Sequence, residues 1–225
     1  MEEEKNIQFS VKRNFGKRID EIWNDEKFNE IPTKKQGYAI QDTIQSDALM
    51  FIGINPSYDG NHGNSYYDNH QEEAKVHKYF RKFQDISQKI EIPWTHFDLL
   101  FVRETQQSEI EKMYSNKNGL DFIVKQLEIS KEVIELAKPR VIIVNNTLAR
   151  KYLGFEKDKD KNENIWMDFD FEFDPKIGTH IITKGKLKNT PVFFTSMLTG
   201  QRALDNGSYE RLIWHIKFVL EKNFC

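Results

Sequence analysis

The sequence has almost no cysteine and no long apolar run. Its single Cys, Cys225, leaves no partner for a disulfide within the 225 residues, so a reducing compartment is expected. No stretch approaches the roughly 20 apolar residues that cross a bilayer. The acidic start MEEEKNIQFS does not resemble a signal peptide. These absences predict a cytoplasmic protein with no membrane partner.

The net charge is small, and the sequence also lacks common cofactor-binding motifs. Lys and Arg number 33 and Asp and Glu 35, a formal charge of −2, so any contact with nucleic acid must be local. The six histidines show no metal-ligand spacing, and no metal is expected. Neither a Walker-type loop nor Gly-x-Gly-x-x-Gly occurs, which argues against an NTPase and a dinucleotide-binding dehydrogenase. No cofactor is therefore expected.

Apolar residues, 38% of the chain with 17 Phe, are ample for one core, and we expect a single domain over residues 1–225. Four stretches predict buried strands: DALMFIGI (47–54), HFDLLFV (96–102), RVIIVNN (140–146) and TPVFFTS (190–196). Helical spacing of apolar residues predicts helices within 15–28, 69–90, 120–137 and 209–221. Alternating strands and helices predict an α/β fold, a three-layer α/β/α sandwich with a four-stranded, mainly parallel sheet.

Two segments fall outside this alternation. Residues 1–46 are expected to form an N-terminal helical extension. Within 155–189, the sequence DFDFEFD (168–174) alternates acid and Phe with the period of a half-exposed strand, and GTHIITKGK (178–186) is expected to pair with it. Residues 155–189 are therefore interpreted as a β-hairpin insertion that departs from the sheet.

Ligands of open α/β sheets bind beyond the carboxyl ends of the strands, where the loops converge. The first such loop begins with GINPS at 53–57, which suits either a chain-reversing turn or the floor of a pocket. The last, SMLTGQR at 196–202, is rich in small and hydroxyl residues whose amides suit a phosphate, although ordinary connections share this composition.

Together the two loops resemble the paired motifs of the uracil-DNA glycosylase superfamily, closest to its mismatch-specific and single-strand-selective branches. There the first motif is of the type Gly-x-Asn-Pro-Gly, and Ser57 here replaces the second Gly. The second motif runs His or Asn, Pro, Ser, a variable residue and Leu. Aligned on Ser196, it places Phe194 at the His or Asn and Leu198 at the Leu. The resemblance implies a hydrolase of DNA repair that extrudes a damaged or mismatched pyrimidine and cleaves its N-glycosidic bond.

The resemblance also implies a role for each matching residue. Asn55 would hold the attacking water, Tyr67 or else Tyr66 would stack on the base, and Asp98 would read the base edge. The implied base pocket comprises Gly53, Ile54, Pro56, Ser57, Tyr67, Asp98 and Phe194. Contacts to the nucleic-acid backbone, or a wedge in the base stack, would come from Ser196, Leu198, Thr199 and Arg202. The implied partner is single-stranded or mismatched DNA, or a nucleotide.

Ordinary structural roles compete with these. Tyr67 can pack its loop, Leu198 can belong to the core, and Arg202 can be a surface charge. Phe194 cannot donate the hydrogen bond that the family's His or Asn gives to the departing base. An inactive relative that binds nucleic acid or a nucleotide is thus the first alternative, and an interaction module that uses the acidic hairpin is the second.

Overall fold

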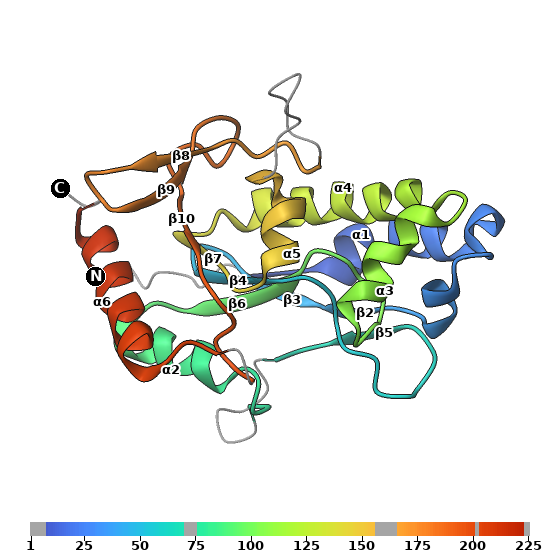
Figure 1. Cartoon of the computed structure of the whole chain (residues 1–225), viewed down its shortest axis with the longest axis horizontal. Coiled ribbons are helices and arrows are strands. Elements are labelled where there is room, and N and C mark those ends of the chain that lie inside the picture. Colours follow the sequence, from blue (N-terminus) through green and yellow to red (C-terminus); the bar gives the residue numbers. More distant parts are fainter. Residues whose placement is uncertain (1–7, 70–75, 156–165, 201–202, 223–225) are drawn as a thin grey trace.

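A six-stranded sheet organises the computed structural model, in which residues 8–69, 76–155, 166–200 and 203–222 are described (Figure 1). Its strands lie in the order β6 (Trp94–Asp98), β4 (Leu49–Gly53), β7 (Val141–Val144), β10 (Pro191–Phe194), β9 (Thr179–Ile182) and β8 (Phe171–Asp174). The first four are parallel, and β9 and β8 are antiparallel to their neighbours. The chain leaves β4 toward β6 and then crosses back to β7, so the strand order reverses between β4 and β7.

Each of the four apolar stretches overlaps one parallel strand, which confirms a mixed α/β fold with a mostly parallel sheet. Of the strand expected over 96–102, only residues 96–98 belong to β6, which begins earlier, at Trp94. The expected number of four strands is corrected to six. The hairpin β8–β9 forms as predicted, but it continues the sheet because β9 pairs with β10, with Val192 opposite His180. The acidic strand β8 thereby becomes an edge of the sheet, where charged side chains discourage pairing with another chain.

Successive strand residues point to opposite faces of the sheet and enter two hydrophobic clusters. Met50, Ile52, Ile142, Val144 and Val192 pack in one cluster with helices α1 (Val11–Asn24) and α4 (Gly119–Ala137). Leu49, Phe51, Val141, Ile143 and Phe193 pack in the other with α2 (Arg81–Ile90) and α6 (Asn206–Lys222). Figure 1 shows these two pairs of helices on opposite sides of the central strands.

The helices follow the apolar spacing of the sequence, with one shorter than expected. Ser10 caps α1 by accepting a hydrogen bond from the Arg13 amide at 3.0 Å. Helix α4 ends at Ala137, just before Pro139, as the sequence indicates. Of the helix expected over 69–90, only residues 81–90 form α2, and residues 70–75 of that range lie outside the described part.

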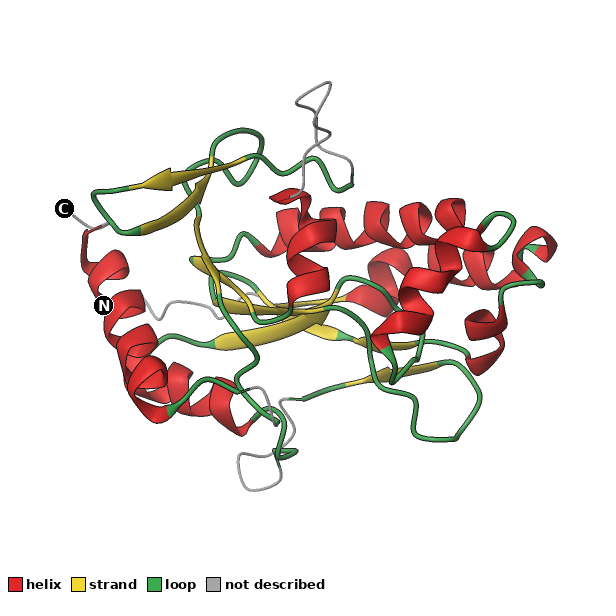
Figure 2. Cartoon of the chain, in the orientation of Figure 1, coloured by secondary structure: helices red, strands yellow, loops and turns green. Residues whose placement is uncertain are grey.

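Shorter elements connect this frame (Figure 2). They are β1 (Gln8–Ser10), β2 (Ala39–Gln41), β3 (Thr43–Gln45), β5 (Ser65–Tyr67), α3 (Gln107–Lys112), α5 (Thr147–Arg150), a π-helical turn (Lys151–Phe155) and 3₁₀ turns at Glu26–Phe28, Pro32–Gln36 and Met113–Ser115. The described part of the helical extension expected over 1–46, residues 8–46, therefore also contains three strands. In the described part of the chain, no helix combines the length and apolarity needed to cross a membrane.

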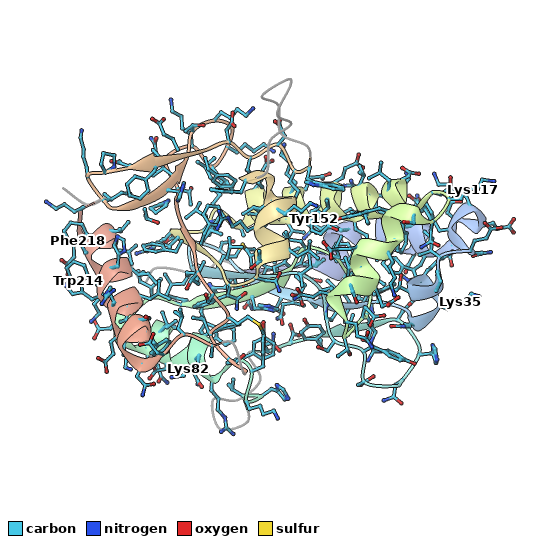
Figure 3. All side chains as sticks on the ribbon, in the orientation of Figure 1. Lys35, Lys82, Lys117, Tyr152, Trp214 and Phe218 are labelled. Atoms are coloured by element: carbon cyan, nitrogen blue, oxygen red, sulfur yellow. The ribbon has the colours of Figure 1, made fainter. Side chains whose placement is uncertain are left out.

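Two contacts position the loops that follow the parallel strands. Strand β2 pairs in parallel with β5, which fixes the end of the long loop that follows β4. The π-helical turn after α5 is anchored by Tyr152, a fully buried side chain labelled near the centre of Figure 3. The hydroxyls of Tyr152 and Tyr114 are hydrogen-bonded to each other. The loop after β4 and the turn after α5 are thus both held against the core.

Candidate functional site

The residues that follow the four parallel strands surround a pocket of about 910 Å³. Its walls come from the loop after β4, the end of β6, Asn145 and Asn146 after β7, and residues 197–200 after β10, with segment 77–80 along one side. This is where open α/β sheets bind ligands, and the strand reversal between β4 and β7 lies at its centre.

Most, but not all, of the residues predicted for a site line this pocket. Those that do are Gly53, Ile54, Asn55, Pro56, Ser57, Tyr67, Asp98 and Thr199. Tyr66, the alternative to Tyr67, faces away and packs against Tyr38, with their ring centroids 5.6 Å apart. The two tyrosines separate because neighbouring residues of β5 point to opposite sides.

Asn55 is held in one orientation by the backbone. Its Nδ2 lies 2.6 Å from the Glu104 carbonyl oxygen, 3.0 Å from that of Pro56 and 3.3 Å from that of Val102. Carbonyl oxygens accept only, so the nitrogen end of the amide must face them. The Oδ1 atom is thereby directed away from these carbonyls and is the acceptor that Asn55 can offer to a ligand or a water.

Gly53 makes room for the carboxyl group of Asp98. The two residues are paired directly across β4 and β6. A Cβ built on Gly53 would overlap Asp98 Oδ1 and come within 3.1 Å of His96 Nε2. A side chain at position 53 would therefore displace Asp98 from the pocket.

Burial favours the uncharged forms of both His96 and Asp98. The Asp98 side chain is 12% exposed and that of His96 is 2% exposed, and Asp98 Oδ1 lies 3.5 Å from His96 Nε2. Burial raises the pKa of Asp98 to about 7 and lowers the pKa of His96 to about 3. Near neutral pH the imidazole is uncharged, so this contact is not an ion pair. With its pKa raised in this way, the Asp98 carboxyl group can hold a proton near neutral pH and donate a hydrogen bond.

Two phenols face the same carboxyl group. Burial, followed by the negative charge of Asp98, raises the pKa of both Tyr67 and Tyr79. A hydrogen bond with the Asn145 side chain acts in the opposite direction on the Tyr79 pKa and is the smaller effect. Both tyrosines consequently remain protonated donors at any pH near neutral.

Asn145 and His96 bring buried polar atoms to the pocket without partners. Asn145 is 3% exposed, and neither its Oδ1 nor the two ring nitrogens of His96 bonds to a described residue. An unpaired buried polar atom costs about 1–3 kcal/mol, so these atoms favour a polar ligand or bound water. Sequence reasoning missed Asn145, His96 and Tyr79, although Asn145 is signalled by its place directly after the apolar run RVIIV.

The last loop departs from the prediction. Phe194 does not line the pocket; its ring packs against Phe155 and His180, with centroids 4.8 and 5.2 Å away. Leu198 is 3% exposed and belongs to the cluster of α2 and α6, so it does not project from the surface as a wedge would. Ser196 is exposed outside the pocket, and Arg202 lies outside the described residues.

Around Asn55 and Asn145 the site presents polar donors and acceptors next to aromatic rings, which suits a planar, polar heterocycle. Lys78 and Glu104 also line the pocket. Phe80 lines it, 5.1 Å from the His96 ring centroid. Within the described ranges, no three His, Cys, Asp or Glu side chains are placed to hold a metal ion. Comparison of the chain with protein-family models and with curated proteins found no match.

Proposed function

We propose that the protein hydrolyses the N-glycosidic bond of an extruded pyrimidine in DNA, as a divergent relative of the uracil-DNA glycosylases with their α/β/α layering. One observation carries this proposal. Asn55 is fixed by three backbone carbonyls and shares a pocket with three buried polar side chains, those of Asp98, His96 and Asn145. Burial favours the uncharged forms of Asp98 and His96. The sequence resemblance of GINPS and the position of the pocket beyond the parallel strands support the same function.

In this proposal Asn55 Oδ1 accepts a hydrogen bond from the water that attacks C1′ of the sugar. A bond forms between the water oxygen and C1′, the bond from C1′ to the base nitrogen breaks, and its electron pair leaves with the base. An amide is too weak a base to take the water's proton in full, so that proton passes to solvent and a slow enzyme is expected. Positive charge develops on the sugar and negative charge on the base.

The departing base needs donors, and the pocket supplies them from strands other than β10. Protonated Asp98, the His96 imidazole and the Tyr79 hydroxyl are the donors available to the base oxygens. Loss of one such donor typically lowers kcat by about 10²–10³. These groups would replace the donor that the second motif loses at Phe194. Asn145 Oδ1 would accept from a ring N–H of the base.

A second candidate is a protein that binds a nucleotide or a nucleic acid without cleaving it. The position of Phe194 favours it, because the residue that aligns with the family's His or Asn packs beside another cavity and offers no donor to this pocket. In this case the same polar groups recognise the base, and Asn55 binds it rather than a water.

Incubation with oligonucleotides carrying one uracil or one mismatched pyrimidine, single-stranded and duplex, distinguishes the two. The hydrolase leaves alkali-labile abasic sites, and Asn55→Ala abolishes them. Asn61→Ala is the matched control, since Asn61 is exposed in the same loop and does not line the pocket. Tight binding without abasic product supports the second candidate. Equal product from Asn55→Ala would refute the role of Asn55.

A further inference from the structure

A second cavity, of about 380 Å³, lies beside Phe194 between the end of β10, strand β9 and helix α6. Figure 1 shows the hairpin β8–β9 and the last turns of α6 at the same end of the molecule. Arg150 from α5 and Arg211 from α6 line the cavity, together with His180 and His215.

The walls of this cavity are cationic. Neither Asp nor Glu occurs among its described lining residues. Within the described ranges, Arg150 and Arg211 make no ion pair, so neither positive charge is neutralised by a carboxylate there. Burial, and next the charge of Arg150, lower the pKa of His180. Uncompensated arginines around a concave surface favour an anionic ligand.

Aromatic rings accompany the arginines. The Arg150 guanidinium lies over Phe155, 3.9 Å from the ring centroid, and 5.3 Å from the centroid of Phe194. Phe173, which is 52% exposed, lies 5.5 Å from the His180 ring. Aromatic rings combined with arginine are typical of sites that hold the base and the phosphate of single-stranded nucleic acid.

The second cavity lies near the first along two segments. Arg150 also lines a cavity of about 560 Å³, whose lining residue Gln107 in turn belongs to the first pocket. Thr195 lines the second cavity and Met197 the first. Their Cα atoms are at most about 7 Å apart, because two residues of extended chain span no more. One strand of nucleic acid can therefore reach both.

We propose that the second cavity binds the nucleotide that flanks the one held in the first pocket. Its phosphate contacts Arg150 and Arg211, and its base stacks on Phe194 and Phe173. This inference rests on the proposed function, which places a nucleotide in the first pocket. Phe194 then has a role of its own, as a stacking surface for the neighbouring base.

The test compares a short and a long probe by calorimetry or fluorescence anisotropy. Deoxyuridine monophosphate reaches the first pocket alone, while a single strand of about eight nucleotides with one uracil spans both. The variants are Arg211→Glu and Arg150→Gln. Lys217→Glu is the control, an exposed charge reversal on the same helix α6 outside the cavity.

Arg211→Glu is expected to weaken binding of the oligonucleotide about tenfold and to reduce the slope of log K against log salt by about 0.7. Arg150→Gln should act in the same direction. Neither should change binding of the mononucleotide, and Lys217→Glu should change neither probe. Oligonucleotide binding that is unaffected by both arginine variants, or equally weakened by Lys217→Glu, would overturn the inference.

Two further outcomes separate this inference from the function on which it rests. If the arginine variants weaken the oligonucleotide while wild type releases no base, the flanking-nucleotide site stands and the hydrolase proposal fails. If Arg211→Glu weakens the mononucleotide as much as the oligonucleotide, the second cavity holds a free nucleotide, and the flanking site is refuted.

Discussion

Gly53 and Asp98 face each other across β4 and β6 so closely that a Cβ on Gly53 would overlap the Asp98 carboxyl oxygen. The glycine of the GINPS motif thus serves the pocket through its neighbour on the adjacent strand. Without it, the carboxyl group could not lie buried beside His96 at the strand end.

Gly53→Ala should displace Asp98 and strain the paired strands. We expect a loss of about 1–3 kcal/mol in the free energy of unfolding, the usual cost of overpacking, together with weaker nucleotide binding. Urea denaturation measures the first and calorimetry the second. Gly16→Ala in α1 is the matched control, since a Cβ there meets its nearest atom, Tyr66 Oη, at 3.4 Å. An unchanged Gly53→Ala protein would contradict the packing described.

Asp98 and His96 should give opposing pH dependences of stability. The pKa of Asp98 is raised from 3.8 to about 7 in the folded protein. The stability that Asp98 contributes is therefore present at low pH and is lost as pH rises from about 4 to 7. The folded pKa of His96 is lowered from 6.5 to about 3, so folding becomes more favourable as pH rises from about 3 to 6.5. In wild type the two effects largely cancel.

Asp98→Asn removes only the first of these effects. Its stability relative to wild type should rise with pH between about 4 and 7, by at most about 1.4 kcal/mol per pH unit. His96→Gln should show the reverse trend over about pH 4 to 6.5. Urea denaturation at several pH values measures both differences. A pH-independent difference for Asp98→Asn would mean that Asp98 titrates in the folded protein as it does in the unfolded chain.

The neighbours Asn145 and Asn146 should respond differently to alanine. Asn146 caps α5, with its Oδ1 accepting from the amides of Leu148 and Ala149 at 2.8 and 3.1 Å, so Asn146→Ala should cost about 1 kcal/mol of stability. Asn145 Oδ1 is buried without a described partner, and this offsets the hydrogen bond between the Asn145 side chain and Tyr79, so Asn145→Ala should change stability less than Asn146→Ala does and should weaken nucleotide binding. Thermal unfolding and calorimetry separate the effects. A large stability loss for Asn145→Ala with intact binding would assign Asn145 to the core instead.

The sequence predicted the framework because the framework depends on local patterns. Apolar runs of strand length predicted the four parallel strands, and the alternating acids of DFDFEFD predicted strand β8. Asn55 was predicted from the resemblance of GINPS to a glycosylase motif, and it lines the pocket. Each of these inferences uses residues close together in the chain.

The face of the sheet to which a side chain points depends on pairing between distant segments, and the predictions for single side chains were incomplete for this reason. Phe193 and Phe194 point to opposite faces of β10, and alignment on Ser196 could not show that Phe194 faces a separate cavity. His96 was overlooked as a lone histidine, since only its pairing opposite Phe51 on β4 buries it beside the pocket. The hairpin's place in the sheet likewise required the pairing of β9 with β10.

The central claim is that Asn55 positions the water that cleaves the glycosidic bond, and the rate of base release under single-turnover conditions tests it most directly. The rate should be measured for wild type, Asn55→Ala and Asn61→Ala on a uracil-containing single strand, with binding of the same strand measured in parallel. We predict that Asn55→Ala lowers the rate at least about 10²-fold while binding changes little, and that Asn61→Ala matches wild type. Base release by Asn55→Ala at the wild-type rate would contradict the claim.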